Sequence, residues 1–274
     1  MLQYVIAGLV LGGIYAIASA GLVITYVSSG ILNFSFGALA YFIARFYYYL
    51  HSQLNWGIVP AAIVSIVIAG PALGVFLYFV LFRYLRLSSP LIKVVATLGL
   101  LVTIPAIATL IFGSGAILKA PGLAPEPVKV FSFIGVPVTM DQIIVYICVV
   151  ATVVLGAVVL RYTDVGLKVR AMVDSPSMTA LSGTSPSAVS IGVWAVSTFF
   201  AGLAGVLAAP IIGLDPGNFT LLIAAAFAAV VAAKLKSLPI AVIVGLAMGV
   251  VTSLIQRYLP PSSSGHIEIV DAVP

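Results

Sequence analysis

The polar stretch RYTDVGLKVRAMVDSPSMTALSGTSP, from Arg161 to Pro186, interrupts a chain that is otherwise almost entirely apolar. It lies between two hydrophobic runs of membrane length, Gln142 to Leu160 and Ser190 to Gly213. A hydrocarbon core about 30 Å thick takes roughly 20 apolar residues per helical crossing. The two runs therefore predict two membrane spans, and the polar stretch between them must lie in water.

The composition extends this interpretation to the whole chain of 274 residues. Hydrophobic residues make up 62% of it and charged residues only 7%, which is typical of an integral membrane protein. The apolar runs are long and lack period-two alternation, which favours helices over a closed barrel. We therefore predict an all-α, polytopic helical membrane protein with about eight transmembrane segments. These segments are Leu2–Val27, Ile31–Leu50, Ile58–Leu81, Leu91–Phe112, Gln142–Leu160, Ser190–Gly213, Leu221–Ala233 and Leu238–Tyr258.

Two of these segments leave alternatives open. The seventh, Leu221–Ala233, is short and is predicted either as a half-helix or as a helix that continues into the eighth. The second contains Arg45 near its outer end. We interpret Arg45 as extending its side chain to the outer interface, and the alternative is that it attracts a carboxylate.

Basic residues indicate which loops face the cytoplasm, because Lys and Arg collect in short cytoplasmic loops. With strict alternation of the spans, eight of the 12 basic residues fall on one side: Arg83, Arg86, Lys93, Arg161, Lys168, Arg170, Lys234 and Lys236. That side is predicted to be cytoplasmic, with both termini outside. The net charge of +5 is thereby assigned to topology, and no nucleic-acid partner is expected. The outer loop from Gly113 to Met140 is predicted as a small lid or hairpin, or as an unstructured connector.

Several chemistries are disfavoured by the residues that the chain lacks. It contains no GxxxxGK[ST] phosphate loop, and its carboxylates fall in loops or at segment ends, which argues against ATP binding and against proton coupling. No catalytic triad or metal-ligand set is found, so no catalytic and no metal-binding residue is predicted. The single cysteine, Cys148, excludes an intrachain disulfide. The pattern favours a transport conduit that another subunit powers.

The polar stretch itself contains the signals of a short helix. Ser175 and Pro176 are typical of a helix start, and Gly183 of a helix end. The predicted helix, Pro176 to Ser182, is barely two turns long and needs a docking surface to persist in water. Met178 and Leu181 lie three apart on one face, as in a helix that docks into a groove. The basic pair upstream, Lys168 and Arg170, suits an acidic partner or anionic lipid.

Five stretches resemble, in order, the permease subunits of branched-chain amino acid ABC importers of the LivH type. They are GLVLGGIYAIASAGLVITY, GILNFSFGALA, VVATLGLL, GLKVRAMVDSPSMTALSGT and FFAGLAGVLAAP. They resemble that family's first helix, its NFAHG signature, its ATLG segment, its cytoplasmic coupling segment and its AGLAG helix. The resemblance extends from about Gln3 to Gly249. Two departures stand out: Phe36 replaces the signature's histidine, and AAKLKSLPI from Ala232 to Ile240 replaces a glycine-rich turn.

The resemblance implies a function and a set of partners. Residues 1–258 would form the permease domain of an ATP-driven importer for branched-chain amino acids or a related small polar metabolite, in a bacterial or archaeal inner membrane. The chain would not be an enzyme and would hold no cofactor. Its partners would be a homologous second permease, two ATPase subunits carrying ATP and Mg, an external substrate-binding protein and membrane lipid. The family usually has one more terminal helix, so the polar tail, residues 259–274, is expected to be truncated. The alternative function is an ATP-independent secondary transporter or facilitator.

Two groups of residues are predicted to carry this function. The ATPase-coupling residues lie in the loop 161–186 and are Gly166, Lys168, Arg170, Asp174, Met178, Leu181 and Gly183, with Met178 where the family more often has Ala. The substrate-pathway residues are Asn33, Ser35, Phe36 and Thr97. The amide of Asn33 can both donate and accept, so we expect it to bind substrate or to stabilise a broken helix near Gly30 and Gly37, and the alternative is that it joins neighbouring helices. Phe36 removes a polar group from this path.

Overall fold

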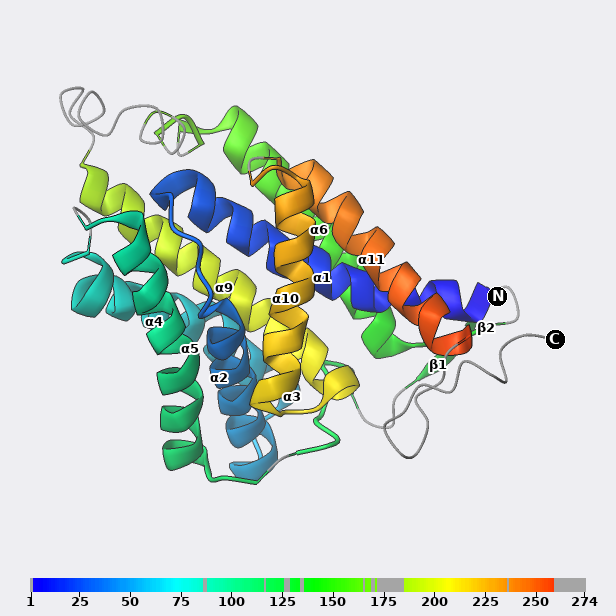
Figure 1. Ribbon diagram of the computed structural model, residues 1–274. Helices are drawn as coiled ribbons and strands as arrows, with labels where there is room; N and C mark the ends of the chain where they lie inside the picture. Colours follow the sequence, from blue (N-terminus) through cyan, green and yellow to red (C-terminus); the bar gives the residue numbers. More distant parts are fainter. Residues whose placement is uncertain are drawn as a thin grey trace.

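A computed structural model of the protein describes residues 2–85, 88–115, 117–125, 129–133, 136–164, 166–168, 171, 185–235 and 237–258. Each of the eight predicted segments is helical in this part of the chain (Figure 1). The elements are α1 (Leu2–Ser29), α2 (Phe36–Tyr48), η1 (Tyr49–Gln53), α3 (Ile58–Ala62), η2 (Ile63–Ala69), α4 (Gly70–Leu77), η3 (Tyr78–Phe82), α5 (Pro90–Phe112), β1 (Val130–Phe133), β2 (Val136–Thr139), α6 (Met140–Tyr162), α9 (Pro186–Ile212), α10 (Pro216–Ala232) and α11 (Leu238–Tyr258).

Five helices among the described residues are long and apolar enough to cross a membrane: Gln3–Val27, Ile58–Phe82, Pro90–Phe112, Ser187–Ile212 and Leu238–Tyr258. The second of these is one helix in which η2 and η3 are wider π-helical turns between α3 and α4 and after α4. The predicted fold class, an all-α polytopic membrane protein, is confirmed.

The second and seventh segments differ from their predicted bounds. Gly30 adopts a left-handed φ of +65°, which ends α1, and the chain becomes helical again only at Phe36. The seventh helix begins earlier than predicted because the Asp215 carboxylate accepts hydrogen bonds from the first free N–H groups of α10. Lys234 has a positive φ of 53° and turns the chain, so α10 and α11 are two helices that pack against each other. The predicted continuation of the seventh segment into the eighth is therefore wrong.

Helix α1 lies at the centre of the bundle and contacts α6, α9, α10 and α11 (Figure 1). Its closest neighbour is α11, where Gly8 and Gly12 face Gly245 and Gly249. A Cβ atom added at Gly12 would lie 2.6 Å from the Leu246 carbonyl oxygen. The glycine pairs therefore let two backbones approach closely, as the small residues at their spacing predict.

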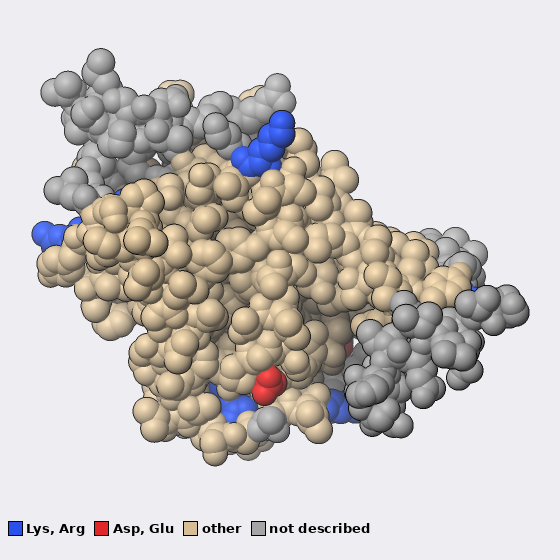
Figure 2. Space-filling view, viewed as in Figure 1, with Lys and Arg blue, Asp and Glu red and all other residues tan. Residues whose placement is uncertain are grey.

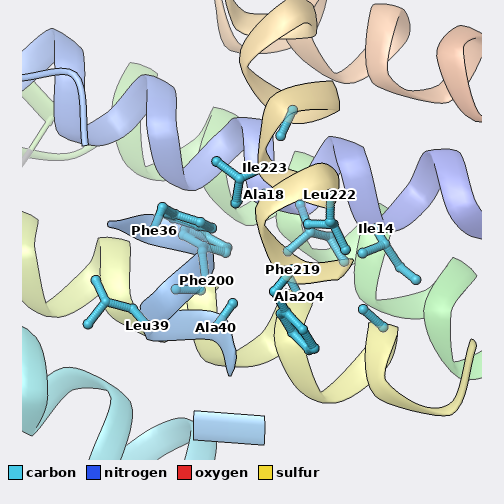
Figure 3. Close-up of a cluster of buried hydrophobic side chains, with 14 of the residues drawn as sticks. Ile14, Ala18, Phe36, Leu39, Ala40, Phe200, Ala204, Phe219, Leu222 and Ile223 are labelled. Carbon is cyan, nitrogen blue, oxygen red and sulfur yellow. The ribbon is translucent and has the colours of Figure 1, made fainter. Parts of the chain in front are cut away.

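The core lies where α1, α2, α9 and α10 meet. Figure 3 shows side chains from all four helices in this cluster, among them Ile14, Phe36, Phe200 and Phe219. Phe36 and Phe219 are completely buried. In this cluster the stretch GILNFSFGALA, which contains Phe36, packs against α9, which carries the stretch FFAGLAGVLAAP.

The connections gather at two opposite ends of the bundle. At one end, the Tyr47 hydroxyl donates to the Gly122 carbonyl oxygen (2.8 Å), and the Leu214 N–H donates to the Ile117 carbonyl oxygen (2.8 Å). The hairpin β1–β2 also lies in the connection between α5 and α6, which confirms the predicted hairpin in this loop. We call this end the outer end, according to the predicted topology, and its orientation in a membrane stays a prediction.

The opposite, inner end carries several of the described cations, among them Arg83, Lys93, Lys168 and Lys234. Figure 2 shows charged side chains at the margins of the face in view, with an uncharged band between them. This separation is what a bilayer requires, since ionised side chains are costly within its core.

Candidate functional site

Most of the predicted ATPase-coupling loop lies outside the described residues. The part that the structure leaves undescribed contains Arg170, Asp174, Met178, Leu181 and Gly183, together with the predicted helix Pro176 to Ser182. Their coupling role stays a prediction.

The two ends of this loop are described. After α6, the Gly166 N–H donates to the Thr163 hydroxyl oxygen (3.3 Å), and Gly166 is buried while Lys168 is exposed. At the other end, the Ser185 hydroxyl oxygen accepts from the Ala188 N–H (3.0 Å) and caps α9. The loop therefore leaves and re-enters the bundle at the inner end, with a cation exposed at its start.

Three of the four predicted pathway residues meet around the break between α1 and α2. The Asn33 side chain is 1% exposed, and its Oδ1 accepts from the Ser35 N–H (3.2 Å) and from the Ser35 hydroxyl (2.6 Å). The Thr97 hydroxyl of α5 lies between two carbonyl oxygens, those of Leu32 (3.2 Å) and Val94 (2.8 Å). Residues 30–35 are thus held against α5 by polar contacts deep in the bundle.

The amide nitrogen of Asn33 is the unusual group in this cluster. Its Nδ2 is buried and has no hydrogen-bond partner. A buried donor without a partner costs about 1–3 kcal/mol. Such a cost is typical of groups that have a function, since buried polar atoms otherwise find partners.

Phe36 lies beside this cluster but packs differently from a polar pathway residue. Its ring occupies the space that Gly21 of α1 leaves free, because a Cβ atom at Gly21 would lie 2.6 Å from Phe36 Cε2. Figure 3 shows Phe36 close to Phe200 of α9. The residue that stands where the family's signature has histidine is therefore part of the apolar core.

Sequence reasoning missed a set of buried hydroxyls that join α1 to its neighbours. The Thr25 and Ser197 hydroxyl oxygens lie 2.5 Å apart and connect α1 with α9, and the Ser19 hydroxyl donates to the Ala226 carbonyl oxygen of α10 (3.2 Å). Thr25, Ser197 and Ser19 are all fully buried. A sequence offers no signal for such pairs, because Ser and Thr in a helix just as often bond to their own backbone.

Arg45 lies at the outer end of α2 and is 3% exposed. Its guanidinium donates to the carbonyl oxygens of Gly115 (2.8 Å) and Gly113 (2.9 Å), and a longer contact of 3.5 Å reaches that of Phe112. The expectation that this side chain extends to the interface is wrong. The two terminal guanidinium nitrogens instead donate to free carbonyls at and just after the C-terminus of α5, where the helix dipole favours a cation.

Comparisons with known proteins agree with this architecture over nearly the whole chain. The family described as "Branched-chain amino acid transport system / permease component" matches residues 4–270. The high-affinity branched-chain amino acid transport system permease protein LivH of Salmonella typhimurium (strain LT2) is 25% identical over 268 residues, which are 94% of this chain and 87% of the relative. LivH of Escherichia coli (strain K12) matches with the same identity and coverage.

An archaeal relative matches almost as far along the chain. The probable branched-chain amino acid transport permease protein LivH of Methanocaldococcus jannaschii is 26% identical over 261 residues, which are 92% of this chain and 80% of the relative. No solved structure matches.

Proposed function

The chain belongs to the family of branched-chain amino acid transport system permease components, and from this premise we propose that it carries branched-chain amino acids or closely related small polar solutes through the inner membrane. It is a multi-pass permease subunit of an ABC importer and works with ATPase and binding-protein partners. We further propose one homologous second permease and two ATPase subunits per complex, with ATP and Mg bound on the ATPases and no catalysis on this chain.

One observation carries the proposal: the family match covers residues 4–270. This range contains all the described helices, apart from the first two residues of α1. A shared function is better supported by such a match than by a match to one motif, because the match extends over nearly the whole chain. The ATP-independent alternative is not favoured. The relatives' names support branched-chain amino acids as the substrate class.

For the solute path we propose the buried polar cluster of Asn33, Ser35 and Thr97. These side chains lie where α1 stops and α2 starts, so backbone carbonyls are also available there. The Nδ2 donor of Asn33 has no protein partner, and a passing carboxylate or carbonyl could accept from it. Broken helices of this kind are where many transporters bind solute.

For coupling we propose the loop 161–186. Closure of the ATPases would push the predicted helix Pro176 to Ser182, which would move α6 and α9 at the two ends of the loop. This is an alternating-access mechanism, in which the path opens to one side at a time. The exposed Lys168 at the start of the loop supports contact with an acidic partner surface.

Uptake by the reconstituted complex tests the function. Proteoliposomes holding this chain and its co-purified partners should accumulate radiolabelled leucine when ATP and the loaded binding protein are present. They should not do so without ATP, even under an imposed ion gradient. Uptake that follows the ion gradient and ignores ATP would establish the facilitator instead.

The coupling loop has its own test. Leu181→Ala should reduce the amount of ATPase retained by the affinity-purified permease and should lower uptake. Leu118→Ala is the matched control, because it makes the same change at a side chain that is 91% exposed at the outer end. Equal ATPase retention by the two variants would show that the loop is not the docking site.

A further inference from the structure

We propose that Arg45 binds the carboxylate of the transported solute at the outer end of the bundle. The inference rests on the proposed function and adds to it a recognition residue on the permease itself. The ligand class is a small free amino acid, held through its α-carboxylate.

The surroundings of Arg45 show a cation that lacks an anion. Only 3% of the residue's surface is exposed, and its described acceptors are neutral carbonyl oxygens. Its Nε–H is buried and has no hydrogen-bond partner. Within the described part of the chain, no carboxylate forms an ion pair with it. An ionisable group at such a depth usually marks a functional site.

Physical chemistry favours a carboxylate at this position. Removing an unpaired charge from water is costly, and the free Nε–H adds the cost of an unsatisfied donor. The planar guanidinium matches a carboxylate with two parallel hydrogen bonds. The bonds to the carbonyl oxygens have one ionised partner, whereas a bound carboxylate supplies a second ionised partner and a bidentate geometry, so it can displace the carbonyl acceptors that Arg45 now contacts.

The segment that supplies these acceptors is also anchored by contacts that do not involve Arg45. Residues 113–124 cross the outer end and are held by three other contacts. The Tyr47 hydroxyl donates to the Gly122 carbonyl oxygen (2.8 Å), and the Ala124 N–H donates to Asp141 Oδ1 (2.8 Å). The third is the backbone bond of Leu214 to Ile117. Arg45 can therefore exchange acceptors while the segment remains attached.

A negative charge lies on the same side of the bundle. Asp215 caps α10 by accepting from the Gly217 N–H (2.8 Å) and the Asn218 N–H (3.3 Å). The Tyr41 ring, one helical turn before Arg45 on α2, packs edge-on against Phe219 in the first turn of α10 (ring centroids 5.7 Å apart), so Arg45 and the Asp215 cap lie on neighbouring helix ends. A zwitterion suits this pair of opposite charges better than an anion alone, and it is the reason for assigning a free amino acid.

Ligand-induced stabilisation of the purified permease–ATPase complex, without the binding protein, tests the site. L-leucine should raise the melting temperature of the wild-type complex, because a ligand that binds only the folded state stabilises it. Leucinamide, which lacks the carboxylate, should not. Arg45→Gln should abolish the leucine shift and lower leucine uptake by about tenfold to a hundredfold. Tyr47→Phe is the control, since it removes a neighbouring contact of the same segment and should keep both.

The outcomes separate this site from the proposed function. Equal shifts with leucine and leucinamide in the wild type would overturn the inference, and this comparison needs no variant to fold. If Arg45→Gln keeps the wild-type melting-temperature shift and leucine uptake, Arg45 has only a structural role. The same holds if Tyr47→Phe loses both as completely as Arg45→Gln does. Failure of the wild-type complex to take up leucine with ATP would instead overturn the proposed function. Arg45→Lys keeps the positive charge but cannot form the two parallel hydrogen bonds of a guanidinium, so leucine should raise the melting temperature of this variant less than that of the wild type.

Discussion

Replacing Gly12 by alanine should push α1 and α11 apart, because the two backbones touch there. A Cβ atom at Gly12 would lie 2.6 Å from the Leu246 carbonyl oxygen and 2.8 Å from the Leu246 Cα, whereas ordinary contact begins at 3.4 Å. Backbone atoms of α11 cannot rotate away as a flexible side chain can. The perturbation is therefore a rigid displacement of one helix.

The size of the effect follows from these distances. Restoring ordinary contact at the Leu246 oxygen requires a retreat of about 0.8 Å, which is 3.4 minus 2.6. A gap of 0.5–1 Å forfeits roughly a quarter to a half of the dispersion energy of the atoms that face it. Overpacking of this kind costs about 1–3 kcal/mol. We expect the free energy of unfolding to fall by that amount.

Unfolding in mixed micelles, titrated with a denaturing detergent and followed by circular dichroism, measures this loss. Gly99→Ala is the matched control, because a Cβ atom at Gly99 of α5 meets nothing within 4 Å. Alanine is the better helix former by up to about 1 kcal/mol, so the control should be neutral or more stable. Wild-type stability in Gly12→Ala would refute the close approach, and an equal loss in both variants would point to a general intolerance of alanine.

Three further results are expected. Thr25→Val and Ser197→Ala, combined in a double-mutant cycle of unfolding free energies, should show a coupling of about 0.6 kcal/mol, and additive losses would contradict the contact between α1 and α9. Asp215→Ala should destabilise the protein by about 1 kcal/mol through loss of the α10 cap, while Asp215→Asn should retain most of the stability in the same titration. Asn33→Leu should lower leucine uptake and should also lower stability by about 1–3 kcal/mol, because it removes the Oδ1 that accepts from the buried Ser35 N–H and hydroxyl together with the unpartnered Nδ2; wild-type uptake would exclude Asn33 from the path.

The number and order of the spans could be predicted because bilayer thickness fixes how long an apolar run must be. A break near Gly30 was one of the roles expected around Asn33, but its extent could not be predicted, since ILNF after Gly30 continues the apolar run and the chain becomes helical again only at Phe36. The start of α10 was within reach of the sequence. Asp215 followed by Pro216 is the same start signal that Ser175 and Pro176 give, and it places the helix five residues before Leu221.

The candidate site was predictable to a lesser degree. Asn33 and Ser35 are neighbours in the sequence, but the contact of Thr97 with Leu32 depends on how α5 packs, and the sequence predicted only that Thr97 lines the same path. The Thr25–Ser197 pair joins positions 172 residues apart, so no local pattern could reveal it. The burial of Arg45 and its hydrogen-bond partners were misjudged for the same reason. Its acceptors, including Gly113, belong to a different helix end that its own segment does not disclose.

The contacts of α1 and of residues 30–35, which follow it, differ in kind, and this difference bears on how the bundle can move. In lipid no hydrophobic effect holds helices together, so close packing of small residues and hydrogen bonds do so. The hydroxyl contacts of Ser19, Thr25 and Thr97 cross three boundaries and contribute about 0.6 kcal/mol each, or about 2 kcal/mol together. Breaking all three would change a conformational equilibrium by only about thirtyfold.

The contact of Gly8 and Gly12 with α11 cannot exchange partners in the way that a hydroxyl can, because its atoms belong to the backbone and do not rotate. We therefore expect α1 and α11 to move as one unit, and the hydroxyl boundaries with α9, α10 and α5 to be where the bundle opens. A disulfide engineered across α1 and α11 should then leave ATP-driven uptake intact, whereas one across α1 and α9 should stop it until it is reduced. Inhibition by both crosslinks would show that α1 moves against every neighbour.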